Sequence, residues 1–286
     1  MPQTGPIREI KIGEIAVPRL GFGAMRITGR GIWGPPPDRA AAIRLLQHAV
    51  QAGVRLIDTA DSYGPFVSEE LIAEALAPYP AGLLIATKGG LERGGPDDWR
   101  SNGDPKHLRE ACEASLRRLR LSRIDLYQLH REDPRFPIEE SIGALKELQS
   151  AGKIRYIGVC NVSLDQLRRV RSIAPVLSVQ NRYNIEDRHS EDVLRACTSE
   201  GTAFIPWHPL GGLESMPRHI VDAIRPIAQR HGASFNQLLL AWLLHKSPIT
   251  APIPGTASIA HFDENMGSTN ISLSASDLAE LDKLAG

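Results

Sequence analysis

Short apolar runs alternate with longer amphipathic segments along most of the chain. Eight runs have the length and composition of strands: RLGFGAM (19–25), VRLIDTA (54–60), LLIATKG (83–89), IDLYQLH (124–130), YIGVCN (156–161), VLSVQN (176–181), AFIPWH (203–208) and APIPGT (251–256). Most of them are nearly continuous in apolar residues, which is typical of strands in a parallel sheet that is covered on both faces. Each of the seven intervening segments is long enough to hold a helix, so the pattern predicts repeated βα units.

Helix signals fall between these runs. Asp38 precedes the amphipathic segment RAAAIRLLQHAVQA as a side-chain N-cap, and Gly53 follows it where a left-handed C-terminal residue is expected. Ser163 and Gln166 have the spacing of a capping box. Residues 234–246 predict a strongly apolar helix before the eighth run. Residues 220–232, with a kink expected at Pro226, and residues 274–286 predict additional helices near the C-terminus.

The first residues of the chain alternate with a shorter period. Residues 7–21 place apolar and polar side chains in turn on either side of Gly13, which predicts a β-hairpin. Eight βα units close a (β/α)8 TIM barrel, and 286 residues is a suitable length for one. We therefore expect a single domain over residues 1–286, an α/β barrel whose floor is capped by the hairpin.

Charge and composition narrow the class of partner. Lys plus Arg and Asp plus Glu each number 33, so the chain has no overall field for nucleic acid or an anionic membrane. Cys112, Cys160 and Cys197 lie far apart with no CxxC, which argues against disulfides or a zinc site and suits a reducing compartment. The N-terminus has no apolar signal core, and no uncharged run approaches the roughly 20 residues of a membrane span. We expect a soluble cytoplasmic protein that acts on a small molecule.

Polar residues stand at the carboxyl ends of the predicted strands. In a barrel these ends open onto one face, so residues that are far apart in sequence meet there. The residues at these ends are Asp58, Lys88, His130, Asn161, Gln180, Trp207 and Gly255. A buried charge is costly unless another group pairs with it, so we expect Asp58 and Lys88 to form an ion pair.

Tyr63 lies five residues beyond Asp58 and can bend back over the barrel mouth. A phenol has an ordinary pKa of about 10, and a neighbouring ammonium such as that of Lys88 lowers it. His130 can donate a hydrogen bond to a substrate oxygen, which leaves a proton donor and a polarising group without a nucleophile. No HxH follows a strand and no cluster offers three metal ligands, so we expect no metal. A metal-dependent barrel hydrolase stays open as a disfavoured alternative, which bound zinc and loss of activity with a chelator would support.

Six segments resemble the aldo-keto reductase superfamily, in order and along essentially the whole chain: GVRLIDTADSYG, IATKGG, LYQLH, GVCN, VQNRYN and IPGTASIAHFDEN. The resemblance implies reversible reduction of a carbonyl group, with a nicotinamide dinucleotide as the reductant. It matches a catalytic tetrad to Asp58, Tyr63, Lys88 and His130. Tyr63 would be the general acid and Lys88 would depress its pKa, while Asp58 would pair with Lys88. His130 would orient the carbonyl.

The same resemblance implies a cofactor shell. Asn161 and Gln180 would hydrogen-bond the carboxamide, and the ring of Trp207 would stack on the nicotinamide. The loop HPLGG would follow the pyrophosphate, and the segment that begins at Gly255 would hold the adenosine phosphates. The other implied contacts are Gly23, Ala24, Met25, Asp58, His208, Pro209, Leu210, Gly211, Thr256, Ser258, His261, Glu264 and Asn265.

The chain departs from the family pattern at the adenosine phosphates. Many members have lysine at the position of Gly255 and arginine at that of His261, and those cations bind the 2′-phosphate of NADPH. The start of a helix near Ser258 can bind phosphate through free N–H groups, and His261 can carry charge. We therefore favour NADP(H) as the cofactor, with NAD(H) as the alternative.

Two tryptophans stand in loops that reach the barrel mouth. Trp33 follows the first strand and Trp99 the third, and both are candidate walls of the substrate pocket. Within the superfamily, GIWGPPPDRAAAI, QNRYNI and IPGTASIAHFDENM look most like bacterial reductases of the pyridoxal reductase type, which makes pyridoxal the leading substrate. Other aldehydes, quinones and keto-sugars stay open. The alternative function is a cofactor-binding regulatory module with little turnover, similar to potassium-channel β-subunits.

Overall fold

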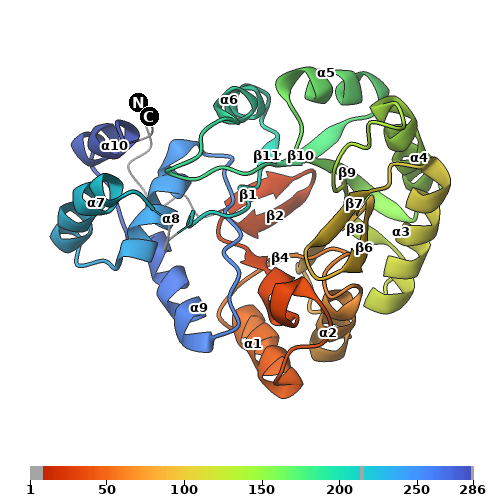
Figure 1. The fold of residues 1–286 in the computed structure, drawn as a ribbon, viewed down its shortest axis with the longest axis horizontal. Coiled ribbons are helices and arrows are strands. Elements are labelled where there is room, and N and C mark those ends of the chain that lie inside the picture. The colour runs from red at the N-terminus through yellow and green to blue at the C-terminus, as the bar shows by residue number, and fades with distance from the viewer. Residues whose placement is uncertain (1–8, 213–215, 285–286) are drawn as a thin grey trace.

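The computed structural model describes residues 9–212 and 216–284. Seven parallel strands form one curled sheet in the order β11-β10-β9-β8-β5-β4-β3 (Figure 1). The strands are β3 Phe22–Gly23, β4 Leu56–Asp58, β5 Leu84–Gly89, β8 Ile124–Leu129, β9 Ile154–Cys160, β10 Val176–Gln180 and β11 Ala203–Phe204. Each of them overlaps one of the first seven predicted runs, which confirms the parallel βα arrangement.

The eighth predicted run, APIPGT, closes the barrel without forming a regular strand. On one side Ala251 N donates to β11 at 2.8 Å. On the other side Pro252 O accepts from Gly21 N at 3.0 Å, and Pro254 O accepts from Gly23 N at 3.3 Å. The two prolines have no N–H, so this segment cannot complete a ladder. The (β/α)8 barrel is confirmed, while the predicted eighth strand is corrected to an extended segment that seals the seam between β3 and β11.

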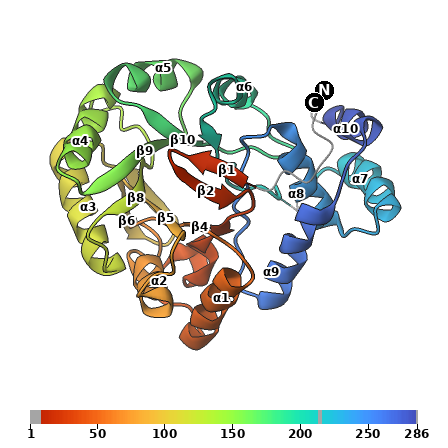
Figure 2. The same cartoon turned by 180° about the vertical axis from the view of Figure 1, so that it is seen from behind.

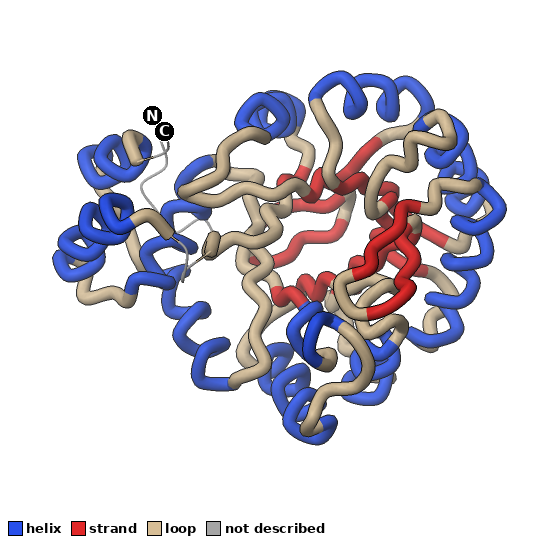
Figure 3. Tube along the Cα trace, in the orientation of Figure 1, coloured by secondary structure: helices blue, strands red, loops and turns tan. Residues whose placement is uncertain are grey.

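Most of the helices surround the sheet (Figure 1, Figure 3). The α-helices are α1 Arg39–Gln51, α2 Val67–Leu76, α3 Pro105–Leu119, α4 Ile138–Ser150, α5 Leu164–Ile173, α6 Glu191–Glu200, α7 Arg218–Arg230, α8 Phe235–Lys246, α9 Ile259–Met266 and α10 Ala275–Asp282. Short 3-10 helices cover η1 Ala24–Ile27, η2 Arg30–Ile32 and η3 Gly267–Asn270. In Figure 3 the blue helices enclose the red strands, and α7 and α10 pack against α8 outside this ring. The additional helices predicted near the C-terminus are confirmed.

Local hydrogen bonds define the predicted helix boundaries. Asp38 accepts from Ala41 N at 2.8 Å at the start of α1, and Gly53 follows the end of that helix with φ of +102°. Ser163 and Gln166 form the predicted capping box at the start of α5. Asp38 and Ser163 begin their helices, and Gly53 ends α1, at the predicted positions. The strands that follow therefore also begin close to their predicted positions.

The N-terminal hairpin closes the floor of the barrel, as predicted (Figure 2). β1 Glu9–Ile12 pairs antiparallel with β2 Ile15–Pro18. At the turn, Gly13 has φ of +61°, and a Cβ there would overlap the ring of Tyr156. The Tyr156 hydroxyl accepts from Glu14 N at 2.9 Å. Tyr156 lies near the start of β9, so the hairpin covers the end of the barrel opposite to the carboxyl ends of the strands.

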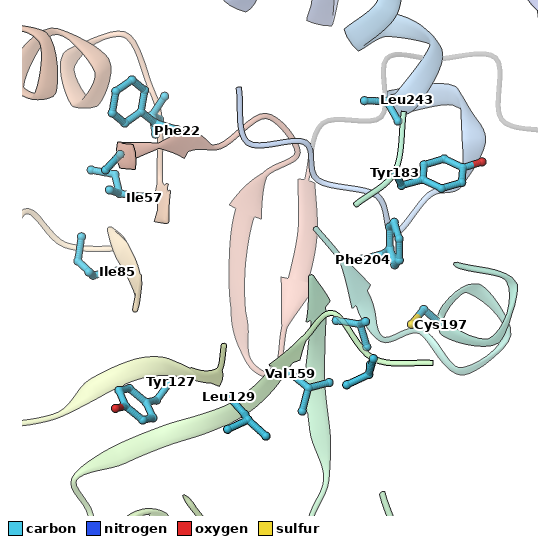
Figure 4. Packing of buried hydrophobic residues seen from close by; sticks show 14 of the residues in the cluster. Phe22, Ile57, Ile85, Tyr127, Leu129, Val159, Tyr183, Cys197, Phe204 and Leu243 are labelled. Carbon is cyan, nitrogen blue, oxygen red and sulfur yellow. The ribbon is translucent and has the colours of Figure 1, made fainter. Parts of the chain in front are cut away.

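Side chains of the parallel strands alternate between two apolar cores. The inner core combines side chains of the hairpin with side chains from inside the barrel. It consists of Ile10, Ile12, Val17, Leu56, Leu84, Ala86, Leu126, Ala203, Ile205, Ala251 and Ile253. The outer core lies between the strands and the helices, as Figure 4 shows for Ile57, Ile85, Tyr127, Val159 and Phe204. Because the period along a strand is two, the next inward side chain after Leu56 is Asp58, and the next after Ala86 is Lys88. The inner apolar core therefore ends where these polar side chains begin.

A second hairpin is present that the sequence pattern does not predict. β6 Leu91–Gly95 pairs antiparallel with β7 Asp98–Ser101 directly after β5. Its sequence is rich in glycine and charge and lacks a run of alternating apolar residues, so the pattern favours a loop there. The pairing places Arg93 opposite Trp99. Since the hairpin starts at the carboxyl end of β5, it stands at the barrel mouth.

We predict opposite effects for two glycine-to-alanine changes. A Cβ on Gly23 would lie 2.6 Å from Ile253 O at the closing seam, so Gly23→Ala must displace backbone. We expect it to lower the free energy of unfolding by about 1–3 kcal/mol. A Cβ on Gly143 in α4 meets nothing within 4 Å, so the matched change Gly143→Ala should raise the free energy of unfolding by about 0.5–1 kcal/mol. Urea unfolding followed by circular dichroism measures both, and a Gly23→Ala variant as stable as the parent would contradict the close approach at the seam.

Candidate functional site

Four inward-pointing polar side chains lie just above the inner apolar core. Asp58 ends β4, Lys88 lies near the end of β5, Gln128 lies in β8 and Gln180 ends β10. Their exposed fractions are 1%, 0%, 0% and 2%. Because the four strands are parallel and curl around one axis, these side chains meet inside the barrel mouth.

Asp58 and Lys88 form the predicted ion pair. Lys88 Nζ lies 2.6 Å from Asp58 Oδ1 and also donates to Thr59 O at 2.8 Å. The other carboxylate oxygen, Asp58 Oδ2, accepts from Gln180 Nε2 at 2.8 Å and from Gln128 Nε2 at 3.2 Å. Burial alone would lower the pKa of Lys88, but the charge of Asp58 and its hydrogen bond outweigh it and raise that pKa above its ordinary value. Lys88 is therefore a permanent cation in the barrel mouth.

Tyr63 lies beside this ion pair with its hydroxyl 3.4 Å from Lys88 Nζ. Burial raises the pKa of Tyr63 to about 12, while the charge of Lys88 acts to lower it and that of Asp58 acts to raise it. Lys88 acts on this pKa in the expected direction, but the loss of solvent around the phenol outweighs the nearby ammonium, so the net pKa is raised and not lowered. Tyr63 therefore holds its proton throughout the neutral pH range.

His130 faces Tyr63 from the end of β8. The two ring centroids are 5.9 Å apart at an interplanar angle of 79°, and His130 Nδ1 lies 3.3 Å from Ser62 Oγ. Burial, followed by the charges of Lys88 and Arg131, holds the pKa of His130 well below its ordinary value. The imidazole is neutral at neutral pH, so it can offer a hydrogen bond from one ring nitrogen without carrying charge.

Asn161 joins the predicted cofactor residues to the predicted catalytic ones. Its Nδ2 donates to His130 O at 3.1 Å, and its Oδ1 accepts from Trp207 Nε1 at 2.9 Å. Asn161 has φ of +57°, a left-handed conformation in which asparagine is several-fold enriched. The indole of Trp207 is thereby held by its edge at the mouth. Gln180, predicted to act with Asn161, directs its Nε2 at Asp58 in this structure.

The predicted pyrophosphate loop makes a tight turn after Trp207. His208 has φ of +55° and Gly211 has φ of +66°, and Gly211 N donates to His208 O at 3.0 Å. Pro209 is buried and Leu210 is half-buried, so the turn presents mainly backbone and the exposed His208. Histidine, like asparagine and aspartate, is enriched among non-glycine residues in this left-handed conformation, so His208 suits the turn.

The predicted adenosine-phosphate segment leads from the closing seam into α9. Thr256 Oγ1 accepts from Ser258 N at 3.0 Å, and Ser258 caps α9 by accepting from His261 N at 3.4 Å. His261 is exposed on the first turn, whereas Asn265 is buried. Glu264 Oε1 accepts from Ser234 Oγ at 2.5 Å, which ties α9 to the start of α8.

On the other side of the seam, Ala24 and Met25 belong to η1 directly after Gly23. The residues around the mouth thus offer amides near Trp207 and hydroxyl, imidazole and backbone donors near α9. Aromatic and amide groups suit a nicotinamide, and donors at a helix start suit phosphate. This set of donors fits an extended dinucleotide.

Arg93 holds the two tryptophans predicted to line the substrate pocket. Its guanidinium carbon lies 3.6 Å from the ring centroid of Trp99 and 5.6 Å from that of Trp33. The Trp99 ring is in turn 6.5 Å from that of Tyr63. Arg93 also donates to four backbone carbonyls, those of Gly31, Ile32, Ser62 and Gly95. One side chain therefore fastens both tryptophan loops to the turn that carries Tyr63.

Three residues of this site do not stand out as functional in the sequence. Gln128 is two residues before His130 and so shares its inward face, a signal that the period of two could have supplied. Ser62 has the sequence context of a residue that shapes the turn before Tyr63, and its contact with His130 depends on tertiary folding. Arg93 could not have been found, because its role depends on the β6–β7 hairpin.

The described residues offer neither a group of metal ligands nor a membrane-spanning helix. Across residues 9–212 and 216–284, no group of three or more His, Cys, Asp or Glu side chains is placed to hold a metal ion. Within the same ranges, no helix combines the length and the apolar composition that crossing a membrane requires.

Comparison with known proteins finds similarity along nearly the whole chain. Residues 19–285 match the model of the aldo/keto reductase family. An uncharacterised oxidoreductase of Schizosaccharomyces pombe is 45% identical over 275 residues, which cover 96% of this chain and 89% of the relative. Pyridoxine 4-dehydrogenase of Escherichia coli K12 is 40% identical over 280 residues, which cover 96% of this chain and 97% of the relative.

Solved structures show the same architecture. A thermostable aldo-keto reductase crystallised with the inhibitor epalrestat superimposes with a TM-score of 0.85 at 32% identity, over 97% of this chain and 99% of the other. An aldo/keto reductase from Klebsiella pneumoniae, crystallised with NADP and acetate, has a TM-score of 0.80 at 28% identity, over 97% of this chain and 95% of the other.

The buried ion pair predicts non-additive effects on stability. Asp58→Asn leaves the Lys88 ammonium buried without its counter-charge, so we expect the free energy of unfolding to fall by about 3–5 kcal/mol. The double change Asp58→Asn with Lys88→Met removes both charges and should recover most of that loss. Urea unfolding of the parent, both single variants and the double variant measures the coupling. Additive losses would mean that the two charges do not depend on each other.

Proposed function

The chain belongs to the aldo/keto reductase family, and on that premise we propose that it reduces the aldehyde of pyridoxal to the alcohol with NADPH as the hydride donor. Membership makes it an NAD(P)H-dependent carbonyl oxidoreductase. The observation that carries the proposal is the buried contact of Tyr63 with the Lys88–Asp58 pair, because it combines a proton donor with a fixed cation and needs an external reductant.

The cofactor follows from relatives and from the donor set of the mouth. Structures of Klebsiella pneumoniae family members contain NADP and NADPH. In this chain Asn161, Gln180 and Trp207 would hold the nicotinamide end, and residues 208–211 and 255–265 would hold the phosphates and the adenosine. When bound, NADPH supplies a hydride to the carbonyl carbon.

Tyr63 would deliver the proton. As the carbonyl oxygen gains negative charge it becomes a much stronger base than a phenolate, so the proton moves from the Tyr63 hydroxyl to that oxygen. Lys88, 3.4 Å away, then stabilises the phenolate that is left behind, and Asp58 keeps Lys88 charged and in place. General acid catalysis of this kind contributes roughly 10²- to 10⁴-fold in rate.

His130 would orient the carbonyl. Its neutral imidazole can donate a hydrogen bond to the carbonyl oxygen without competing with Tyr63 as an acid, because it has no extra proton to lose. When the Ser62 hydroxyl donates to Nδ1, the ring hydrogen lies on Nε2. Ser62 therefore supports the tautomer that leaves Nε2 as the donor.

The choice of pyridoxal rests on a relative and on the aromatic wall. The Escherichia coli relative at 40% identity is a pyridoxine 4-dehydrogenase. Trp33 and Trp99, joined by Arg93, flank Tyr63 with aromatic surface that suits a flat heteroaromatic ring. A planar aldehyde such as pyridoxal could lie against this surface with its carbonyl directed at Tyr63.

The proposal predicts consumption of NADPH that depends on Tyr63. Purified protein should oxidise NADPH when pyridoxal is added, measured by the decay of the NADPH absorbance. Tyr63→Phe should keep the fold and NADPH binding but lower kcat by roughly 10²- to 10⁴-fold, because phenylalanine retains the ring and loses the proton donor. Turnover by Tyr63→Phe at the parent rate would refute the role of the phenol. NADPH binding without turnover of pyridoxal or of other aldehydes would instead favour the regulatory module.

The pKa of Tyr63 sets the expected pH dependence of reduction. Its proton is present below the raised pKa of about 12 and is lost only as the pH rises towards that value. We therefore expect kcat/KM for reduction to stay level from about pH 7 to about pH 10. His130 is already neutral, so its titration should not add a limb near neutrality. Initial rates across this range test both statements, and a basic limb near pH 8 would show that Lys88 outweighs burial.

A further inference from the structure

The segment proposed to hold the adenosine phosphates contains no lysine or arginine. From Gly255 to Asn265 its ionisable residues are His261, Asp263 and Glu264. The 2′-phosphate that distinguishes NADPH from NADH carries about two negative charges and calls for a cation. If NADPH is the cofactor, that cation has to come from another part of the chain.

Position 255 cannot supply it. A Cβ on Gly255 would lie 2.7 Å from Gly23 O, a backbone atom of the closing seam, so a long side chain there would require the seam to open. The same Cβ would lie 3.5 Å from Arg26 Cγ. The stem of Arg26 therefore runs alongside the position from which a side chain at 255 would start.

Arg26 is an exposed residue of η1. Among the described residues it has no ion pair and no side-chain hydrogen bond, although most arginines of the chain have one or both. Its charge also acts on His208 in the pyrophosphate loop. Burial, Arg182 and Arg26 lower the pKa of His208, while Glu186 and Asp187 act to raise it. The Arg26 side chain thus lies beside one of the segments proposed to hold the phosphates, and its charge reaches the other.

The two acidic residues of the segment 255–265 have other partners and do not pair with Arg26. Asp263 lies 2.6 Å from His48 Nε2 on α1, and Glu264 accepts from Ser234 on α8. Both carboxylates are engaged on the side of α9 that packs against other helices. The charge of Arg26 is therefore available to a ligand.

We propose that Arg26 binds the 2′-phosphate of NADPH and sets the preference of the enzyme for NADPH over NADH. A guanidinium presents paired donors that match phosphate oxygens, and Ser258 and His261 at the start of α9 can add further donors. The inference rests on the proposed function, since it assigns a residue to the cofactor named there. It replaces the expectation that His261 and the start of α9 alone compensate for the missing cations.

Equilibrium binding tests this assignment without relying on turnover. Quenching of tryptophan fluorescence gives the Kd of NADPH and of NADH, and calorimetry gives the Kd of the fragments 2′,5′-ADP and 5′-AMP. Arg26→Ala should raise the Kd of NADPH and of 2′,5′-ADP by about 10- to 100-fold and change that of NADH and of 5′-AMP by less than about threefold. Arg26→Lys should lie between the parent and Arg26→Ala, because it keeps the charge but loses the paired donors.

Arg117→Ala is the matched control. Arg117 is also exposed, but it lies in the last turn of α3, at the floor end of the barrel, and its removal should leave every Kd unchanged. Circular dichroism of each variant checks the fold.

Two results would overturn the assignment: an unchanged Kd of NADPH in Arg26→Ala, or an equal loss for NADPH and NADH, which would place Arg26 at a phosphate common to both. If the parent protein binds neither dinucleotide, the proposed function falls together with it. Tight NADPH binding that depends on Arg26, without reduction of pyridoxal, would support the assignment and reject the substrate.

Discussion

The rest of the site depends on a single buried ion pair. Lys88 and Asp58 lie where almost no solvent reaches, so each charge needs the other and both need hydrogen bonds from protein groups. Those groups come from different strands: Gln128 from β8, Gln180 from β10, and the carbonyl of Thr59 beyond β4. Asp58 and Lys88 lie on neighbouring strands, and the hydrogen bonds from β8 and β10 depend on the curl of the sheet, so the pair fixes the ends of four strands relative to one another.

Tyr63 shows how two opposing effects are balanced in such a place. Burial keeps the phenol protonated before the reaction. The neighbouring Lys88 ammonium stabilises the phenolate once the proton has been transferred. A more exposed tyrosine would lose the first effect, and a tyrosine without Lys88 would lose the second. The same burial keeps His130 neutral. Burial thus leaves Tyr63 as the group with a proton to donate and His130 as an uncharged hydrogen-bond donor.

Much of the fold could be predicted because strands that are covered on both faces appear in the sequence as nearly continuous apolar runs. Asp58 and Lys88 stand at the carboxyl ends of such strands, which is enough to predict that they meet, and glycine and capping residues mark the helix ends. The eighth strand was predicted wrongly. Its apolar composition is typical of a strand, but Pro252 and Pro254 have no N–H groups with which to form regular inter-strand hydrogen bonds. The β6–β7 hairpin and Arg93 escaped prediction, since their stability comes from stacking on Trp99 and Trp33 rather than from a local pattern. The net pKa of Tyr63 depends on how deeply it is buried, which a sequence does not record.

The two prolines of the closing seam have a dynamic consequence. Every other boundary in the barrel is a ladder of inter-strand hydrogen bonds, whereas here alternate residues have no amide hydrogen to contribute. The seam is therefore the boundary at which we expect the barrel to open locally most often. The amide hydrogens of Gly21 and Gly23 should exchange with solvent faster than those of β5 and β8. A ligand that contacts both Arg26 and the start of α9 would connect the two sides of this seam. Binding of the cofactor would therefore reduce the opening of the barrel at the seam.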